Sequence, residues 1–300
     1  MIIGIDHGYG FIKTKNTIFA SGVAKMTTQP PISSGVLSYN GSYYQVGVSP
    51  DGIAADKTEN EDYFVLTLAA IAEEMRRYGM LTCDVTLAVG LPLTRYGIEK
   101  DKFVAYLRKD GPVEFMYEDK SYSVSIDSNI LVYPQGYSAI IGKLPSIKGT
   151  SFLVDIGTGT TEILPIAGDH RIDLKRAFTV QWGISDCIAR INEAISREFQ
   201  TVLSTDQILD VMLARDIVIP ERVRNVIISE LSAFCADTFS MLRQKKVTYE
   251  ITQTFILGGG AGLLKRYSER KPEMVTYITD IRANAIGYEA LARARAEKNK

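Results

Sequence analysis

The chain has few residues of the types that build disulfide frameworks and metal centres. It contains three cysteines and two histidines in 300 residues. Cys83, Cys187 and Cys235 are odd in number and far apart, so they give neither a CxxC pair nor a disulfide framework. A reducing compartment suits such cysteines best. The two histidines, His7 and His170, cannot make a histidine-rich metal site. We therefore expect a cytoplasmic protein.

The sequence also has little excess charge and no long apolar run. The formal net charge is -1, so there is no general electrostatic reason to expect direct binding to nucleic acid. No apolar run reaches the roughly 18 residues of a membrane span. No basic segment precedes an apolar one at the start, so we expect no signal peptide. Hydrophobic residues make up 46% and charged residues 23%, which is typical of a soluble protein with room for two domains.

The most informative stretch is at residues 151–163, which read SFLVDIGTGTTEI. An apolar run of strand length ends near Asp155, a glycine- and threonine-rich turn follows, and a second apolar run returns. Gly157 and Gly159 permit positive φ and a close approach of the backbone. Successive N–H groups of such a turn can form an anion site. By itself the turn is equally typical of an ordinary glycine-rich hairpin.

A second copy of this pattern lies at the start of the chain. An apolar strand pattern is followed at residues 6–13 by DHGYGFIK. Lys13, on the returning strand, could reach phosphates bound at such an anion site. The alternative interpretation is an ordinary surface lysine of the strand. We expect His7 to be a turn residue. Two such hairpins about 150 residues apart imply two related halves that face one ligand from opposite sides.

Helix signals separate these hairpins from other parts of the chain. The TENE pattern at residues 58–61 predicts a capping box, followed by a helix whose buried face carries Phe64, Leu68, Ile71 and Met75. Ser185 is the predicted N-cap of another helix, whose buried face carries Ile188, Ile191, Ile195 and Phe199.

Gln135 directly follows the predicted strand at residues 130–134. A glutamine there can orient a water molecule without becoming charged, and a polar helix N-terminus fits equally well. A short helix is predicted to about residue 142. Residues 143–150, with Pro145 and Gly149, are the best predicted domain boundary.

A third glycine cluster follows the strand predicted at residues 249–257. Residues 258–262 read GGGAG and precede a predicted helix. Strand, glycine cluster and helix form a geometry in which backbone can lie against a base or phosphate. The pattern is not a Rossmann fingerprint, because it lacks the preceding βαβ unit and the downstream acid.

In this order the motifs resemble those of the actin, Hsp70 and sugar-kinase superfamily. DHGYGFIK at 6–13 and DIGTGT at 155–160 look like its two phosphate loops, and ILGGGA at 256–261 looks like its adenosine motif. PQ at 134–135 and NAIGY at 284–288 look like its connecting helices. The resemblance implies an α/β, actin-like ATPase fold with two related ribonuclease-H-like domains around a nucleotide cleft. Domain I would comprise residues 1–142 and 284–300, and domain II residues 143–283.

Within this superfamily the chain most resembles bacterial actin-like plasmid-segregation proteins of the ParM type. VGLP at residues 89–92 after a strand, the near-minimal length and the loop at Tyr9 indicate this group. Tyr9 stands where conventional actin has a serine. Gln135 stands where ParM has a glutamate, and glutamine is the actin-like residue.

The resemblance implies a site for ATP or GTP with Mg²⁺. Asp6, Lys13, Gln135 and Asp155 would be its catalytic residues. Asp6 and Asp155 would hold Mg²⁺ largely through water, Lys13 would neutralise phosphate charge, and Gln135 would position the attacking water. The nucleotide would be contacted by Gly8, Tyr9, Gly10, Lys13, Gly157, Thr158, Gly159, Thr160, Gly183, Arg190, Glu193, Gly258, Gly259 and Gly260.

The implied function is a nucleotide-dependent, head-to-tail filament for plasmid or DNA segregation, assisted by a DNA-binding adaptor. A sugar or small-metabolite kinase is the rival enzyme, and it needs a carboxylate base. Gln135 is a poor base, and Asp84, expected ahead of its strand, is badly placed. A third alternative is a structural filament protein that does not hydrolyse nucleotide.

Overall fold

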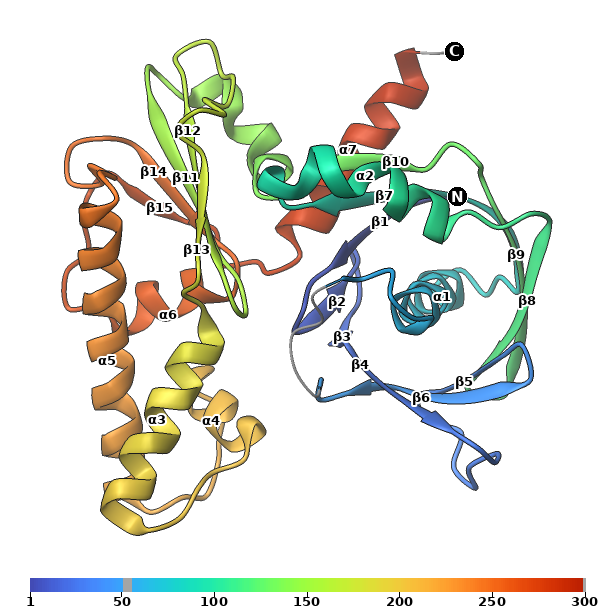
Figure 1. Ribbon diagram of the computed structural model, residues 1–300, viewed down its shortest axis with the longest axis horizontal. Coiled ribbons are helices and arrows are strands. Elements are labelled where there is room, and N and C mark those ends of the chain that lie inside the picture. The colour runs from blue at the N-terminus through green and yellow to red at the C-terminus, as the bar shows by residue number, and fades with distance from the viewer. Residues whose placement is uncertain (51–55, 299–300) are drawn as a thin grey trace. The chain divides into compact units, whose positions relative to one another are not determined.

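The computed structural model describes residues 1–50 and 56–298. The chain divides into two compact units (Figure 1). Unit 1 comprises Met1–Gly142 with Arg282–Lys300, and unit 2 comprises Lys143–Ile281. Each unit buries its own hydrophobic cluster, so each has the core that an independent domain requires.

Unit 1 is built on one long, curved sheet. Its strands are β1 (Ile2–His7), β2 (Phe11–Lys13), β3 (Ile18–Ala20), β4 (Gly22–Met26), β5 (Val36–Tyr39), β6 (Ser42–Val48), β7 (Thr82–Leu91), β8 (Pro112–Tyr117), β9 (Lys120–Ile126) and β10 (Leu131–Pro134). Their order is β3-β2-β1-β7-β9-β8-β5-β6-β4, and β10 also pairs with β7. The first half of β7 pairs with β9 and its second half with β10, both in parallel.

The helix α1 (Asp62–Arg76) fills the inside of this curved sheet (Figure 1). All side chains from position 63 to position 72 are buried, as expected of a helix that is apolar all round. The predicted capping box is wrong: the N-cap is Glu61, without a side-chain bond. Thr58 bonds instead to Asp56, and the Asp62 N–H donates to the side chain of Asn60.

The remaining helices of unit 1 are α2 (Leu93–Leu107) and α7 (Ala283–Lys298). The predicted short helix after β10 is a 3-10 helix, η1 (Tyr137–Ser146). α7 packs on β1, β7 and β10, and glycines allow it to lie close to the sheet. A Cβ on Gly4 would lie 2.1 Å from the Ala285 carbonyl oxygen, and a Cβ on Gly90 would lie 1.9 Å from the Tyr288 hydroxyl.

Unit 2 has a five-stranded sheet and a group of helices. Its strands are β11 (Ser151–Ile156), β12 (Thr161–Ile166), β13 (Phe178–Val180), β14 (Thr254–Leu257) and β15 (Val275–Tyr277), and its helices are α3 (Ile184–Phe199), α4 (Thr205–Met212), α5 (Glu221–Gln244) and α6 (Gly259–Tyr267). Cys187 and Cys235 lie in its core, and these two and Cys83 are buried free thiols. Across both described ranges, no helix has the length and apolarity to cross a bilayer.

The two units share one strand plan. Unit 1 contains the order β3-β2-β1-β7-β10, and unit 2 has the order β13-β12-β11-β14-β15. In each unit the first three strands of this order are antiparallel to their neighbours. The third, fourth and fifth strands are parallel to one another. The duplicated hairpin motif therefore belongs to a duplicated α/β fold, which confirms the prediction of two related halves.

Candidate functional site

The first glycine turn joins β1 to β2 and brings Asp6, Lys13 and Gly8 together. Asp6 and Lys13 are opposite each other in the antiparallel pair, and the Lys13 Nζ lies 3.0 Å from the Asp6 Oδ2. Asp6 is 3% exposed. A Cβ on Gly8 would lie 2.7 Å from the Phe11 carbonyl oxygen and 2.8 Å from the Lys13 Nζ, so a larger residue would crowd the turn and displace the ammonium. Lys13 is thus an ion-paired lysine of the turn and not a free surface lysine.

The carbonyl groups of this turn are held by protein donors. The Tyr9 carbonyl accepts from the Ser21 hydroxyl, and the Gly10 carbonyl accepts from the Ser21 N–H at 3.1 Å. The His7 carbonyl accepts from the Lys57 ammonium. No residue in the described ranges accepts from the N–H groups of Gly8, Tyr9 or Gly10. The N–H and C=O of a trans peptide point in opposite directions. The turn therefore offers N–H groups on the side away from its bound carbonyls.

Two cationic residues around this turn are absent from the predicted site. Lys57 is 8% exposed, and its Nζ lies 4.8 Å from the centre of the Tyr9 ring. Burial lowers the pKa of Lys57 to about 8. Arg95, on α2, donates to the Tyr9 hydroxyl at 3.0 Å. Neither residue lies in a sequence motif. The feature that distinguishes Lys57 is its burial, which the sequence alone does not reveal.

His7 is not a turn residue, contrary to prediction. It is the last residue of β1, 1% exposed, and its Nε2 lies 2.8 Å from the Thr67 hydroxyl of α1. Burial lowers its pKa to about 3, so the ring is neutral at physiological pH. His7 fixes the end of β1 against α1 and so supports the turn from inside the unit.

The second glycine turn joins β11 to β12 and is held in the same way from α3. The Gly157 carbonyl accepts from the Ile184 N–H at 3.1 Å, and the Thr158 carbonyl accepts from the Ser185 N–H at 2.8 Å. The Ser185 hydroxyl also donates to the Thr158 carbonyl, at 2.9 Å. Within the described part of the chain, the N–H groups of Thr158, Gly159 and Thr160 have no acceptor. Again carbonyls are bound and N–H groups remain available.

The start of α3 differs from the prediction because of this contact. Gly183 is the N-cap, and its N–H donates to the Asp186 carboxylate at 2.7 Å. Ser185 lies inside the helix and binds the turn instead of capping. A Cβ on Gly183 would lie 2.4 Å from the Thr158 carbonyl oxygen, so glycine lets the helix start meet the turn.

The third glycine cluster lies against the end of β11. Gly258 follows β14, which pairs in parallel with β11, and it has a φ of 80°. A Cβ there would lie 2.4 Å from the Ile156 carbonyl oxygen and 2.5 Å from the Asp155 Oδ1. Gly260 is in contact with the Ile156 side chain, and Gly259 lies next to Ile184. Unit 2 thus gathers Asp155, the second turn, the start of α3 and the start of α6 in one place.

Gln135 lies at the same edge of its sheet as Asp6. β1, β7 and β10 are parallel, so their carboxyl ends share an edge, where ligands of open α/β sheets bind. The Gln135 N–H donates to the Leu91 carbonyl at 2.9 Å. The next N–H, of Gly136, donates to the buried Asn284 side chain at 2.8 Å. This bond ties the residues after β10 to the first turn of α7.

Arg190 and Glu193 lie further along α3 and make ion pairs within unit 2. The Arg190 guanidinium lies 2.7 Å from the Asp237 carboxylate and 3.7 Å from the Glu230 carboxylate, both on α5. Glu193 pairs with Arg197 at 3.0 Å, and its side chain is 72% exposed. The structure therefore places these two candidates with α5 and the outer face of α3, and not with the glycine clusters.

The carboxylates of Asp6 and Asp155 suit a hard cation. Mg²⁺ takes oxygen ligands, keeps several waters and is usually bound through one or two carboxylates plus substrate phosphates. Both side chains are buried, at 3% and 5% exposure, at the end of a strand beside a glycine turn. The described residues contain no group of three or more metal-ligating side chains.

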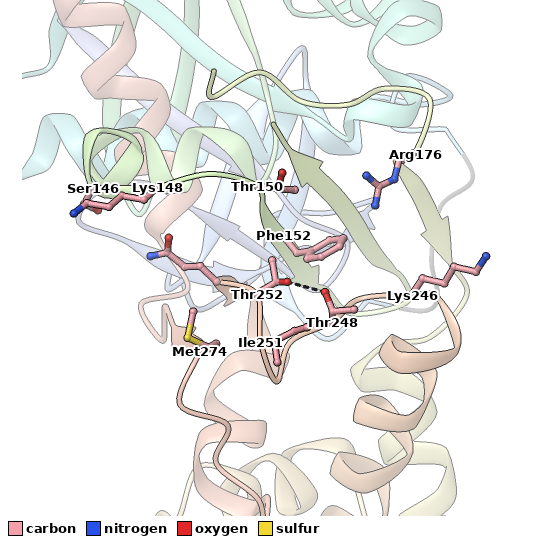
Figure 2. A pocket seen from close by; sticks show the side chains of 11 residues that line it. Ser146, Lys148, Thr150, Phe152, Arg176, Lys246, Thr248, Ile251, Thr252 and Met274 are labelled. Carbon is pink, nitrogen blue, oxygen red and sulfur yellow. Dashed lines mark hydrogen bonds between the residues drawn. The ribbon is translucent and has the colours of Figure 1, made fainter. Parts of the chain in front are cut away.

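Unit 2 also has a cavity of about 590 Å³, shown in Figure 2. It is lined by Thr150 and Phe152 at the start of β11, by Thr252 before β14 and by Met274 before β15. Because β11, β14 and β15 are parallel, the cavity is at their amino ends. The glycine clusters are at their carboxyl ends, about 20 Å away along a six-residue strand. The cavity is therefore separate from the candidate site.

Comparisons with known proteins agree with this arrangement. The model of the actin-like protein N-terminal domain matches residues 4–137, and that of the archaeal MreB-like actin homologue C-terminal domain matches residues 153–269. Similar solved structures include an archaeal actin homologue (23% identity, TM-score 0.78) and its complex with ADP (22%, 0.77). A 15-stranded ParM filament from Clostridium botulinum is also similar (21%, 0.77). Each covers 98% of this chain and 99% of its own.

A search of curated proteins found no match. The two family models nevertheless match consecutive parts of the chain that contain both glycine turns and the third glycine cluster. The structural matches extend over nearly the whole length and establish the fold. With its duplicated strand plan and its matches in both halves, the chain has the actin-like fold.

Proposed function

We propose that this protein is an ATPase that assembles into nucleotide-dependent filaments. One observation carries the proposal. Protein donors bind the carbonyls of His7, Tyr9 and Gly10 in the first turn and of Gly157 and Thr158 in the second, while the N–H groups of residues 8–10 and 158–160 have no acceptor within the described ranges. N–H groups left free in this way form an anion site. Two such turns suit the phosphates of a nucleotide, and a relative of the same fold has been solved with ADP.

In this proposal unit 1 acts as actin-like domain I and unit 2 as domain II, and both turns bind the phosphates of one nucleotide. Asp6 and Asp155 would hold Mg²⁺ largely through water, and the ion would supply positive charge to the phosphates. Lys13 adds a further cation, and Gln135 orients the attacking water. Positioning and electrostatic stabilisation account for most of the catalysis of phosphoryl transfer. Gly258 and the start of α6 contact the nucleoside. GTP could replace ATP, because the phosphate contacts would be the same.

The assembly part of the proposal is supported by the relatives. Both the ParM protein from Clostridium botulinum and Alp12 have been solved as filaments. We propose that this chain associates head to tail, because such heterologous contacts need not close into a ring. A cytoplasmic filament of this type would serve plasmid or DNA segregation through a DNA-binding adaptor protein. The net charge of -1 favours an adaptor over direct DNA binding.

The candidate base of the rival kinase function lies far from the first turn. Asp84, its candidate base, lies inside β7 and not ahead of it. It is seven residues before Leu91, whose carbonyl binds Gln135. At about 3.3 Å per residue, that distance is on the order of 23 Å, too far for a hydrogen bond to a substrate at the turn.

Right-angle light scattering with simultaneous measurement of phosphate release tests the proposal. Addition of Mg-ATP to the purified protein should raise scattering, which then decays as phosphate appears. Asp155→Asn should abolish phosphate release, and Asp216→Asn, which changes an exposed acid between α4 and α5, should behave like the wild type. A flat scattering trace with sugar-stimulated turnover would instead support a kinase, and scattering without phosphate release would support a structural filament.

A further inference from the structure

Lys57 is a buried cation that the proposed mechanism does not use. Its side chain is 8% exposed, and no carboxylate forms an ion pair with it among the described residues. Lysine is almost never fully buried without a partner, because desolvation of the ammonium is costly. The depressed pKa of Lys57, about 8, reflects this cost. Asp6 and Glu99 favour the charged form of Lys57 from a distance, but they do not offset the cost of burial, so a cation kept at this position calls for a reason other than stability.

The contacts of Lys57 identify what it holds. Its ammonium donates to the His7 carbonyl and lies 4.8 Å from the Tyr9 ring centre and 5.7 Å from that of Tyr63. The two aromatic faces provide the favourable environment that a desolvated cation can obtain from π-electrons. Lys57 therefore contacts the first glycine turn at both its start and its middle residue.

The bond to His7 determines the direction of the next N–H group. The His7 carbonyl and the Gly8 N–H belong to one planar trans peptide and point in opposite directions. A donor that binds the carbonyl therefore turns the N–H toward the other side. Ser21 does the same for the peptide that carries the Gly10 N–H, through the Tyr9 carbonyl.

Unit 2 solves the same problem with different groups. There the Gly157 carbonyl is bound by the Ile184 N–H and the Thr158 carbonyl by Ser185. Ser21 is the counterpart of Ser185, because Tyr9 and Thr158 are each three residues after the aspartate of their turn. Lys57 binds one peptide earlier than any α3 donor, at His7, so its contact is particular to unit 1. The Lys57 ammonium differs from a helix N–H in one respect: it adds a full positive charge in a poorly solvated position, where electrostatic interactions are least screened.

We propose that Lys57 is a positioning residue for nucleotide phosphates, which orients the Gly8 N–H through the His7 carbonyl and adds buried positive charge to the first turn. This proposal rests on the proposed nucleotide-binding function. The ligand class is a nucleoside polyphosphate, because a nucleoside alone carries no charge to be recognised by these groups.

Isothermal titration calorimetry of the full chain with ATP, ADP and adenosine in the presence of Mg²⁺ tests this role. Lys57→Met keeps the length and apolar stem of the side chain and removes the ammonium. We expect it to weaken binding of ATP and ADP by about tenfold or more, with adenosine affinity unchanged. Thermal unfolding shows whether this variant is folded at the titration temperature, because loss of the ammonium relieves a desolvation cost but also leaves the His7 carbonyl without its donor. Lys120→Met, on an exposed strand residue of the same unit, is the matched control and should bind like the wild type.

Other outcomes contradict the proposal in recognisable ways. Equal ATP affinity of Lys57→Met and the wild type would show that Lys57 does not serve the phosphates. An equal loss of ATP and adenosine affinity would show a purely structural role. If Lys57→Met does not fold, Ser21→Ala provides the second test: it should lower ATP affinity and spare adenosine, and unchanged ATP affinity would refute the carbonyl-orienting role. A wild-type protein that binds no nucleotide would refute the proposed function itself.

Discussion

Gly258→Ala tests the junction between the third glycine cluster and the end of β11. Gly258 has a φ of 80° and a ψ of -173°, a backbone region that is essentially restricted to glycine and costs alanine about 1–3 kcal/mol. Its Cβ would lie 2.4 Å from the Ile156 carbonyl oxygen and 2.5 Å from the Asp155 Oδ1. The overpacking caused by these two contacts costs about 1–3 kcal/mol more. We expect a total loss of about 2–6 kcal/mol, which corresponds to a thermal midpoint lowered by roughly 5–20 °C.

A second glycine of the same helix gives a control with the opposite sign. Gly262 lies inside α6, and a Cβ there would have no atom within 4 Å. Alanine should raise the stability by about 0.5–1 kcal/mol, because glycine is a poor helix former. Chemical denaturation monitored by circular dichroism, together with thermal unfolding, measures both variants.

The effect of Gly258→Ala should extend to ligand binding. The new Cβ would displace the Asp155 carboxylate, so nucleotide affinity should fall even at temperatures at which the variant is folded, while Gly262→Ala should bind normally. Equal stability of Gly258→Ala and Gly262→Ala would refute the reasoning, because it would mean that the backbone at position 258 does not have the conformation and contacts described above.

Three further predictions concern unit 1. Gln135→Ala should lower the rate of phosphate release about a hundredfold with little change in ATP affinity, and equal losses in both would contradict a role in orienting water. Asn284→Ala leaves the buried Gly136 N–H without an acceptor and should cost about 1–3 kcal/mol in urea unfolding. The folded-state pKa of His7, about 3, lies below its ordinary value of 6.5, so stability is retained above 6.5 and lost as pH falls. The slope is at most about 1.4 kcal/mol per pH unit, and His7→Gln should reduce it.

The sequence predicted the elements that local patterns specify. Both strand–acid–turn hairpins are present, and so is the strand, glycine cluster and helix around Gly258. Each depends on a run of apolar residues broken by glycine, a pattern that is readable within a dozen residues. The repeated motif also predicted that the two units share a strand order, because each hairpin belongs to the same five-strand arrangement.

Residues whose roles depend on distant partners could not be predicted in this way. Ser185 has the composition of an N-cap, but its hydroxyl binds Thr158, 27 positions earlier in the chain. His7 follows the strand pattern by one residue and precedes glycine, yet it is buried through a contact with Thr67 on α1. Arg190 is a plausible nucleotide ligand by its place on α3, but two carboxylates of α5 bind it. In each case a tertiary contact determines the role of the side chain.

The two turns also show why a glycine motif describes only half of a proposed anion site. The glycines allow the backbone to bend, but the direction of each N–H depends on what binds the carbonyl of the same peptide. In unit 2 those donors are mostly main-chain N–H groups at the start of α3, which no side-chain substitution removes directly. They can be moved away only by a change at a residue such as Gly183, which allows the start of the helix to approach the turn. In unit 1 the donors at His7 and Tyr9 are the side chains of Lys57 and Ser21. Equivalent turns can therefore differ in how substitution, pH and local charge affect them, even though their glycine patterns are alike.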